Sequence, residues 1–266
     1  MLVTEIMRIK GSVVLITGAS QGIGAACARA FADRGARLSL VARNAEKLRQ
    51  VGGSEAVRTA GDITVDEVRR QVVKRTLDHF GDIDILINNA GMGLYSPAWS
   101  APDEAARQLF ELNLFAPLAL TQLVVPYMRD RRRGMIVNIG SIAGKMTLPW
   151  FTLYSVSKYA LGSLTDGLRM ELKPHGIHAM TVCPGYVKTD FQAHALGSTP
   201  PDPVMKGRRF AITAEACADA IARGVERDAR TVVVPRIGWI LVALNRLFPG
   251  IVESRLAAIN RDRDAA

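Results

Sequence analysis

Apolar residues occur along the chain in short runs, and the longer stretches between these runs repeat apolar residues at helical spacing. Runs rich in β-branched residues predict strands, because such side chains suit a pleated and buried surface. The predicted strands are residues 13–17, 38–41, 83–87, 135–139, 178–183 and 231–234. Strands that alternate with helices favour parallel pairing through right-handed crossovers. The pattern therefore predicts an α/β fold, a doubly wound parallel sheet of about seven strands with helices on both faces.

The same pattern gives no sign of a boundary between domains. A chain of 266 residues with 48% apolar content can bury one large core. A segment rich in proline and glycine, residues 191–210, lies too late in the chain to separate two domains, and we expect it to form a mobile lid. Residues 1–266 are therefore expected to form a single domain, with a helical extension over residues 237–262.

The chain is basic, with a formal net charge of +9 and a sequence pI of about 9.8. Such a charge suits nucleic acid, an anionic membrane surface or a phosphate-rich cofactor. The densest basic run, Arg129 with residues 131–133, has no interleaved aromatic residues and no zinc-finger or basic-zipper spacing. We interpret it as an exposed loop and expect no nucleic-acid partner.

The three cysteines, Cys27, Cys183 and Cys217, are far apart and have no C-x-x-C spacing. This usage favours a reducing compartment over a disulfide scaffold, and no metal site is expected. The N-terminus lacks the apolar core and small-residue cleavage site of a secretory signal. The longest apolar stretch, residues 238–244, is shorter than the roughly 20 residues that a membrane-spanning helix needs. We expect a cytoplasmic protein with no transmembrane segment.

A glycine-rich turn joins the first predicted strand to the helical pattern that follows it. Gly18, Gly22 and Gly24 permit a tight turn and close approach of a pyrophosphate to the backbone. The helix N-terminus supplies free N–H groups and a positive dipole end. The spacing G-x-x-x-G-x-G departs from the commoner G-x-G-x-x-G of Rossmann enzymes. We predict a dinucleotide site here, to which Ser20, Gln21 and Ile23 of the same turn also belong.

The second predicted strand ends at Arg43, which follows Gly24 by 19 positions. Near this distance an acidic residue would hold the ribose 2′-hydroxyl of NAD. An arginine suits a 2′-phosphate through a charge-assisted forked contact, so NADP(H) is preferred over NAD(H). A basic residue at Gln21 would have added a second phosphate contact, and its absence weakens this preference.

Ser141 follows the strand predicted at residues 135–139, and Tyr154 and Lys158 follow it at a spacing of four. On a helix that spacing places the tyrosine and the lysine on one face. Tyrosine titrates near pH 10, and an adjacent ammonium lowers its pKa by stabilising the phenolate. Tyr154 is therefore a candidate general acid or base, and Ser141 can hydrogen-bond the reacting oxygen.

With these motifs in this order, residues 11–234 resemble the short, single-domain branch of the short-chain dehydrogenase/reductase family. The matching pieces are residues 17–24, Asp62, Ile63, residues 88–91, Asn113, Ser141, residues 154–158 and residues 184–189. The resemblance implies that Asp62 and Ile63 flank the adenine. It implies that Asn89, Ala90 and Gly91 support the cofactor and that Pro184, Gly185, Val187 and Thr189 line the nicotinamide pocket.

The resemblance also implies a reaction, in which a hydride passes between the cofactor and a carbonyl or secondary alcohol of a small, apolar substrate. Tyr154 would donate the proton, Lys158 would bind the ribose hydroxyls and lower the phenol pKa, and Asn113 would hold the water of a proton relay. The runner-up reaction is reduction of a 3-oxoacyl thioester, with the arginines of residues 129–133 as docking charges for an acidic carrier protein. A redox-inactive cofactor sensor is a further alternative, although such a sensor is expected to lack the tyrosine and lysine pair.

Family resemblance further implies a homodimer or homotetramer that forms through residues 103–128 and 155–173. The C-terminal residues 237–259 repeat apolar residues at helical spacing, interrupted at Pro249. Arg236, Arg246 and Arg255 accompany them. Two interpretations remain open, namely a helix that makes peripheral contact with an anionic membrane, and a tail that packs over the pocket or a neighbouring subunit.

Overall fold

A computed structural model describes residues 7–198 and 211–261. Of the lid predicted at residues 191–210, the part from 199 to 210 lies outside the described residues. The described part of that segment contains a short 3₁₀ turn, Gln192–His194, and the strand β8, Leu196–Gly197. Strand β8 pairs in parallel with β5, Leu94–Tyr95.

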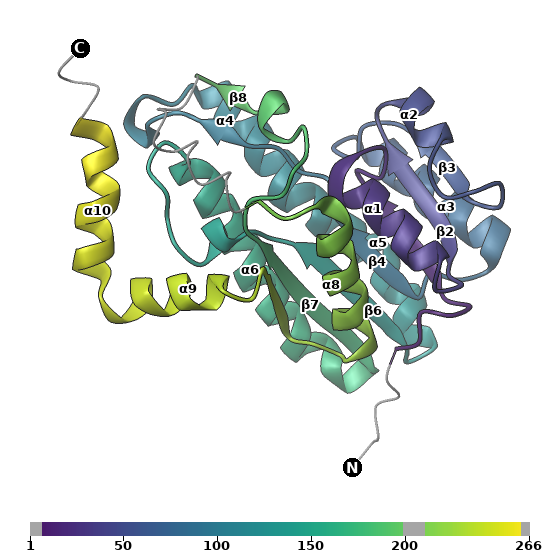
Figure 1. Cartoon of the computed structure of the whole chain (residues 1–266). Coiled ribbons are helices and arrows are strands. Elements are labelled where there is room, and N and C mark those ends of the chain that lie inside the picture. The colour runs from purple at the N-terminus through teal and green to yellow at the C-terminus, as the bar shows by residue number, and fades with distance from the viewer. Residues whose placement is uncertain (1–6, 199–210, 262–266) are drawn as a thin grey trace.

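A seven-stranded parallel sheet forms the centre of the protein, in the order β3-β2-β1-β4-β6-β7-β9 (Figure 1). Its strands are β1 Val13–Thr17, β2 Arg37–Ala42, β3 Val57–Ala60, β4 Ile85–Asn88, β6 Gly134–Ile139, β7 Ile177–Pro184 and β9 Thr231–Val234. The order reverses direction between β1 and β4, which is the switch point of a doubly wound fold. This architecture confirms the predicted fold class.

The sheet is buried on both faces, as expected for parallel strands connected by helices. Along β1, Leu15 faces one core while Val14 and Ile16 face the other. Helices α1 and α8 cover the Ile16 side, and α3, α5 and α6 cover the Leu15 side. The α-helices are α1 Gly22–Ala32, α2 Ala45–Arg49, α3 Asp66–Phe80, α4 Asp103–Phe110, α5 Ala116–Asp130, α6 Thr152–Leu172, α8 Ala214–Glu226, α9 Gly238–Leu247 and α10 Pro249–Arg261.

Strand β3 was not predicted from the sequence. It is an edge strand of four residues in which Thr59 alone is buried. Its Arg58 side chain turns back to donate hydrogen bonds to the carbonyl groups of Leu48 and Val51. A strand of four residues with one buried position shows no hydrophobic pattern in the sequence.

One described helix is long and apolar enough, by length and composition, to cross a membrane. It is the continuous helical stretch Asp103–Asp130, which comprises α4, a π-helical turn at Glu111–Phe115 and α5. Leu120 and Val124 of this stretch are fully buried in the core beneath the sheet. One side of the stretch therefore packs in the core of the protein.

The basic run predicted as an exposed loop has a structural role at the amino ends of the strands. The guanidinium of Arg131 lies 3.0 Å from the carboxylate of Asp82 and 3.1 Å from that of Asp84. Asp84 is 5% exposed, and its other carboxylate oxygen accepts a hydrogen bond of 2.8 Å from the backbone N–H of Val13. Arg131 thus neutralises a buried charge that holds the start of β1.

Removing this cation tests its structural role. The substitution Arg131→Leu leaves the Asp84 carboxylate buried without its nearest partner, and we expect it to lower the free energy of unfolding by about 2 kcal/mol. Urea unfolding followed by circular dichroism measures this loss. The control Arg129→Leu changes an exposed arginine of the same run and should alter stability by less than about 0.5 kcal/mol. Equal stabilities of the two variants would show that Arg131 is an ordinary surface residue.

Candidate active site

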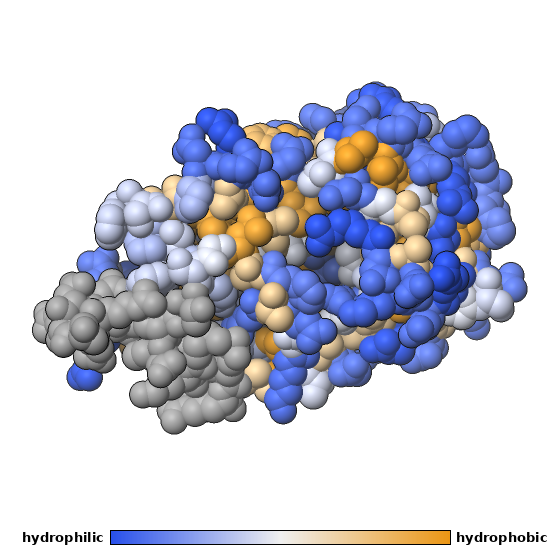
Figure 2. All heavy atoms as spheres, turned by 90° about the horizontal axis from the view of Figure 1, so that it is seen from above, coloured by the Kyte–Doolittle hydropathy of each residue, from blue (hydrophilic) through white to orange (hydrophobic). Residues whose placement is uncertain are grey.

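A cleft of about 800 Å³ opens at the carboxyl edge of the sheet. Figure 2 looks down on this edge and shows a hollow in the surface. Most of the residues predicted for the site line this cleft: Gly18, Ser20, Gln21, Gly22, Ile23, Arg43, Asp62, Ile63, Asn89, Ala90, Gly91, Ser141, Tyr154, Lys158, Pro184, Gly185, Val187 and Thr189. The two remaining residues, Gly24 and Asn113, are buried beside it.

The carboxyl ends of β1 and β4 are tied together beneath the cleft. The hydroxyl of Thr17 accepts hydrogen bonds from the backbone N–H groups of Asn89, at 3.0 Å, and Ala90, at 2.9 Å. The side-chain amide of Asn89 donates to the carbonyl groups of Thr17, at 2.9 Å, and Gly18, at 3.2 Å. These bonds fix the turn between β1 and α1 against the adjacent strand end.

The turn is shaped for close approach of a ligand to its backbone. Gly18 has a φ of +64°, and a Cβ there would lie 2.9 Å from Cα of Ala90. A Cβ at Gly24 would lie 2.3 Å from the carbonyl oxygen of Gly18, so only glycine allows α1 to start so near the turn. Among the described residues, no side chain caps the start of α1, and its first turn has no acid. These features fit the pyrophosphate of a dinucleotide.

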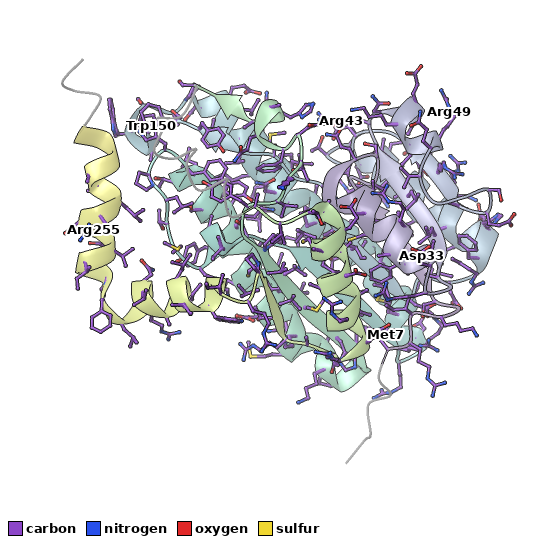
Figure 3. All side chains as sticks on the ribbon, in the orientation of Figure 1. Met7, Asp33, Arg43, Arg49, Trp150 and Arg255 are labelled. Carbon is purple, nitrogen blue, oxygen red and sulfur yellow. The ribbon has the colours of Figure 1, made fainter. Side chains whose placement is uncertain are left out.

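Two cations line the cleft near the carboxyl end of β2, the region predicted to receive the adenosine ribose. Arg43 lines the cleft after β2 and is labelled in Figure 3. Lys47 also lines the cleft, and its ammonium donates a hydrogen bond of 2.9 Å to the side-chain carbonyl of Gln21. Lys47 was missed from the sequence. Its signal is Asn44, whose side chain accepts from the N–H of Lys47 at 2.9 Å and begins the short helix α2.

The reacting groups come from two neighbouring elements. Ser141 follows β6, and its hydroxyl accepts a hydrogen bond of 3.1 Å from the backbone N–H of Ala143. Tyr154 and Lys158 lie one turn apart on α6, as predicted. The ammonium of Lys158 lies 5.7 Å from the centre of the Tyr154 ring and donates a hydrogen bond of 2.9 Å to the carbonyl group of Ile139. All three side chains face the same cleft.

Burial sets the protonation of this pair. It raises the pKa of the Tyr154 phenol well above its usual value, and the hydrogen bond to Ser141 offsets only part of this shift. Burial also lowers the pKa of Lys158 to about 8. Lys158, whose ammonium lies 5.7 Å from the ring centre, does not contribute to the shift of the phenol pKa, so the predicted lowering of that pKa by Lys158 is not found. At neutral pH the phenol keeps its proton, which is the form that a general acid requires.

Asn113 lies in the π-helical turn between α4 and α5 and is fully buried. Its side-chain carbonyl accepts a hydrogen bond from the N–H of Met92, and its amide donates to the carbonyl of Met92, both at 2.9 Å. The amide also lies 3.1 Å from the hydroxyl of Ser157 on α6. Asn113 therefore joins the loop after β4 to the helix that carries Tyr154.

An aromatic stack forms one wall of the cleft. The ring of Phe151 lies 4.5 Å from that of Tyr95 and 4.2 Å from that of Tyr154, both in stacked orientation. Phe191 meets Tyr154 edge-on at 5.7 Å. Tyr95 and Phe151 were missed from the sequence, because no local motif connects two residues that only the fold brings together.

No group of three or more histidine, cysteine or acidic residues that could hold a metal ion occurs in the part of the chain that the structure describes. All three cysteines are free and buried.

Comparison with known proteins places the chain among relatives with this arrangement. A family model described as short chain dehydrogenase matches residues 12–197. Dehydrogenase/reductase SDR family member 7B of Bos taurus is 35% identical over 200 residues, which cover 71% of this chain and 62% of that protein. The match thus spans less than two thirds of the bovine relative. 11-beta-hydroxysteroid dehydrogenase-like 2 of Arabidopsis thaliana is 34% identical over 259 residues, which cover 92% of this chain and 80% of that protein.

Solved structures agree with these matches. A short-chain dehydrogenase from Streptomyces avermitilis has a TM-score of 0.83 at 28% identity, and the match covers 95% of this chain and 98% of that one. A short-chain dehydrogenase from Burkholderia cenocepacia, solved in complex with NADP, has a TM-score of 0.80 at 30% identity. That match covers 94% of this chain and 99% of the other. The chain belongs to the short-chain dehydrogenase/reductase family.

The low pKa of Lys158 predicts an effect of pH on stability. Below pH 8 the folded protein carries a buried ammonium, whose desolvation costs stability. Between pH 8 and the usual lysine value of 10.5, the unfolded chain binds more protons than the folded one, so stability rises with pH. The variant Lys158→Met lacks this penalty but loses the bond to Ile139. We expect it to be more stable than wild type at pH 7 by about 2 kcal/mol.

The stability difference should shrink between pH 8 and pH 10.5, and urea unfolding at several pH values without cofactor measures it. The control Lys74→Met removes an exposed lysine on α3 and should show no such trend. A difference that stays constant or grows as pH rises would contradict the assigned burial penalty.

Proposed function

We propose that this protein is an NADP(H)-preferring oxidoreductase that transfers a hydride between the cofactor and a carbonyl or secondary alcohol of an apolar substrate. The observation that carries the proposal is that Ser141, the buried Tyr154 and Lys158 line one cleft, whose other end has the backbone of a dinucleotide site. When bound, the cofactor supplies the hydride chemistry.

Each side chain then has a defined task in the reducing direction. Ser141 hydrogen-bonds the substrate oxygen, and Tyr154 donates its phenolic proton to that oxygen as negative charge develops there. Lys158 binds the ribose hydroxyls of the cofactor. Asn113 fixes the position of α6 relative to the loop after β4, and proton return from solvent passes beside it.

The substitution Tyr154→Phe tests the proton donor. It keeps the ring that stacks on Phe151 but removes the acid, so we expect turnover to fall by about a thousandfold while NADPH affinity changes by less than about threefold. NADPH absorbance with a panel of ketones, aldehydes, steroids and acyl thioesters measures turnover, and Tyr159→Phe on the outer side of α6 is the matched control. Unchanged turnover in Tyr154→Phe would refute the assignment.

Arg43 and Lys47 support the preference for NADP(H), because both cations line the cleft near the end of β2, where we expect a 2′-phosphate. The end of that strand has no acidic residue to hold a 2′-hydroxyl. Lys47 supplies the second cation that the sequence lacks at position 21. The solved relatives are mixed in this respect, since the Burkholderia cenocepacia protein was solved with NADP and a 3-ketoacyl-(acyl-carrier-protein) reductase from Brucella melitensis with NADH.

Cofactor titration tests this preference. The variant Arg43→Ala loses a charge-assisted contact, so we expect NADPH binding to weaken about thirtyfold and NADH binding by less than about threefold. Lys47→Ala should weaken NADPH binding about fivefold. Arg49→Ala, at the far end of the same helix and labelled in Figure 3, should leave both affinities unchanged. Equal weakening for NADPH and NADH in Arg43→Ala would disprove recognition of the 2′-phosphate.

The aromatic stack of Tyr95, Phe151 and Phe191 supports an apolar substrate. The Brucella melitensis neighbour, at 25% identity and a TM-score of 0.78, keeps reduction of a 3-oxoacyl thioester as the second candidate. The arginines of residues 129–133 do not favour that candidate, because they lie at the amino ends of the strands, opposite the cleft. A redox-inactive sensor would have no need of the paired Tyr154 and Lys158.

We further propose a homodimer or homotetramer in the cytoplasm. Exposed apolar side chains on α5, on α6 and on the π-helical turn before α5 support the assembly: Phe115, Tyr127, Val156, Tyr159 and Met170. Light scattering that gives the mass of a monomer would exclude this assembly.

The buried free cysteines support a reducing compartment and therefore the cytoplasmic location. Recovery of the protein only from an oxidising compartment would exclude that location.

A further inference from the structure

The C-terminal helices α9 and α10 form an arm with little support from the rest of the protein. Figure 1 shows them, in yellow, projecting beyond the helices that cover the sheet. A break at Phe248 separates α9 from α10. The arm carries eight large apolar side chains that are exposed: Ile237, Trp239, Ile240, Leu241, Leu244, Leu247, Phe248 and Ile251. A patch of this size on one short segment is unusual for a soluble protein and marks a contact surface.

The two faces of α9 differ in a way that follows the helical repeat. Gly238, Val242 and Asn245 are buried or half-buried and share the face toward the body. On the opposite face Ile240 is 57% exposed, while Leu244 is 44% and Leu247 70% exposed. The helix therefore turns its most apolar face away from the protein, which is the reverse of a helix that packs on its own core.

Charge around this apolar face is mostly positive. Arg236 precedes α9, Arg246 lies in its last turn, and Arg255 lies on α10, and all three are exposed. Glu253 is the one acid between residues 236 and 258. Trp239 and Phe248 stand near the two ends of α9. Exposed aliphatic residues, bordered by arginines and flanked by aromatic rings, are the composition of helices that lie in the interface of an anionic bilayer.

The arm is also anchored beside the reacting groups. Gly238 packs so closely that a Cβ there would lie 2.8 Å from Val233 and 2.9 Å from Ile142, the residue that follows Ser141. The N–H of Gly185 donates a hydrogen bond of 2.8 Å to the carbonyl of Val234, just before the arm begins. A membrane bound by the arm would therefore lie close to the side of the protein where Ile142 and Gly185 line the cleft.

We infer that the arm docks the protein on the surface of a bilayer that contains anionic lipids, with the α9 face of Ile240, Leu244 and Leu247 inserted among the acyl chains. The arginines contact the lipid headgroups. A second copy of this chain is the competing occupant, but it would leave Arg236, Arg246 and Arg255 facing a protein whose own net charge is +9. An anionic bilayer complements that charge. This inference does not depend on the proposed reaction.

Sedimentation with vesicles tests the inference on the full chain. Wild type should sediment with vesicles of phosphatidylcholine and phosphatidylglycerol, and much less with phosphatidylcholine alone or in high salt. The triple variant Ile240→Ser, Leu244→Ser, Leu247→Ser should bind the mixed vesicles at least about tenfold more weakly. The control Val65→Ser, Trp99→Ser removes exposed apolar side chains elsewhere and should bind as wild type does. NADPH titration confirms that both variants are folded.

Three results would overturn the inference. The first is wild type that stays in the supernatant with the mixed vesicles, and the second is a triple variant that sediments as wild type does. The third is a fall in the oligomeric mass of the triple variant, measured by light scattering without lipid, because that fall would show that a second copy covers the arm.

Discussion

The tie between the carboxyl ends of β1 and β4 is the constraint on which the site depends. Hydrogen bonds from Asn89 and Ala90 to Thr17, and from the Asn89 amide to the carbonyl of Gly18, hold the two strands at the point where the sheet order reverses. That reversal separates the crossover helices and leaves a crevice between them. With the turn fixed, Gly24 can pack against the carbonyl of Gly18, and the uncapped start of α1 points into the crevice. The dinucleotide site is therefore a consequence of how two strand ends are joined.

Burial then decides the chemistry that the crevice can perform. Tyr154 and Lys158 sit on α6 at the far side of the same crevice, where removal from water disfavours the charged form of each group. The result is a neutral phenol and an ammonium whose pKa of about 8 lies near physiological pH. The protein carries a destabilising group at its centre, which is typical of a site arranged for function.

The sequence predicts the structural features whose residues lie close together along the chain. Three features each show their pattern within a few residues of sequence: the glycine turn, the spacing of Tyr154 and Lys158, and the buried central strands. Strand β3 was not predicted, because an edge strand with one buried residue shows no hydrophobic periodicity in the sequence. Lys47 and Phe151 were not predicted, because each is recognised only by a partner that the fold brings near, Gln21 for Lys47 and Tyr154 for Phe151. The arginine run does form an exposed turn, as predicted, but the contact of Arg131 with the buried Asp84 was not predicted, because Asp84 lies 47 residues away.

The proposed hydride transfer from a nicotinamide to a carbonyl carbon beside Tyr154 can be followed with an isotope. The protein is incubated with a panel of ketones and aldehydes and with NADPH that carries deuterium at both C4 positions, and the alcohols are analysed by mass spectrometry. We expect alcohols with one deuterium on the carbon that bears the oxygen, and about a thousandfold less alcohol from the Tyr154→Phe variant. Alcohols formed without the label, or a protein that binds NADPH and reduces no carbonyl of the panel, would contradict this proposal.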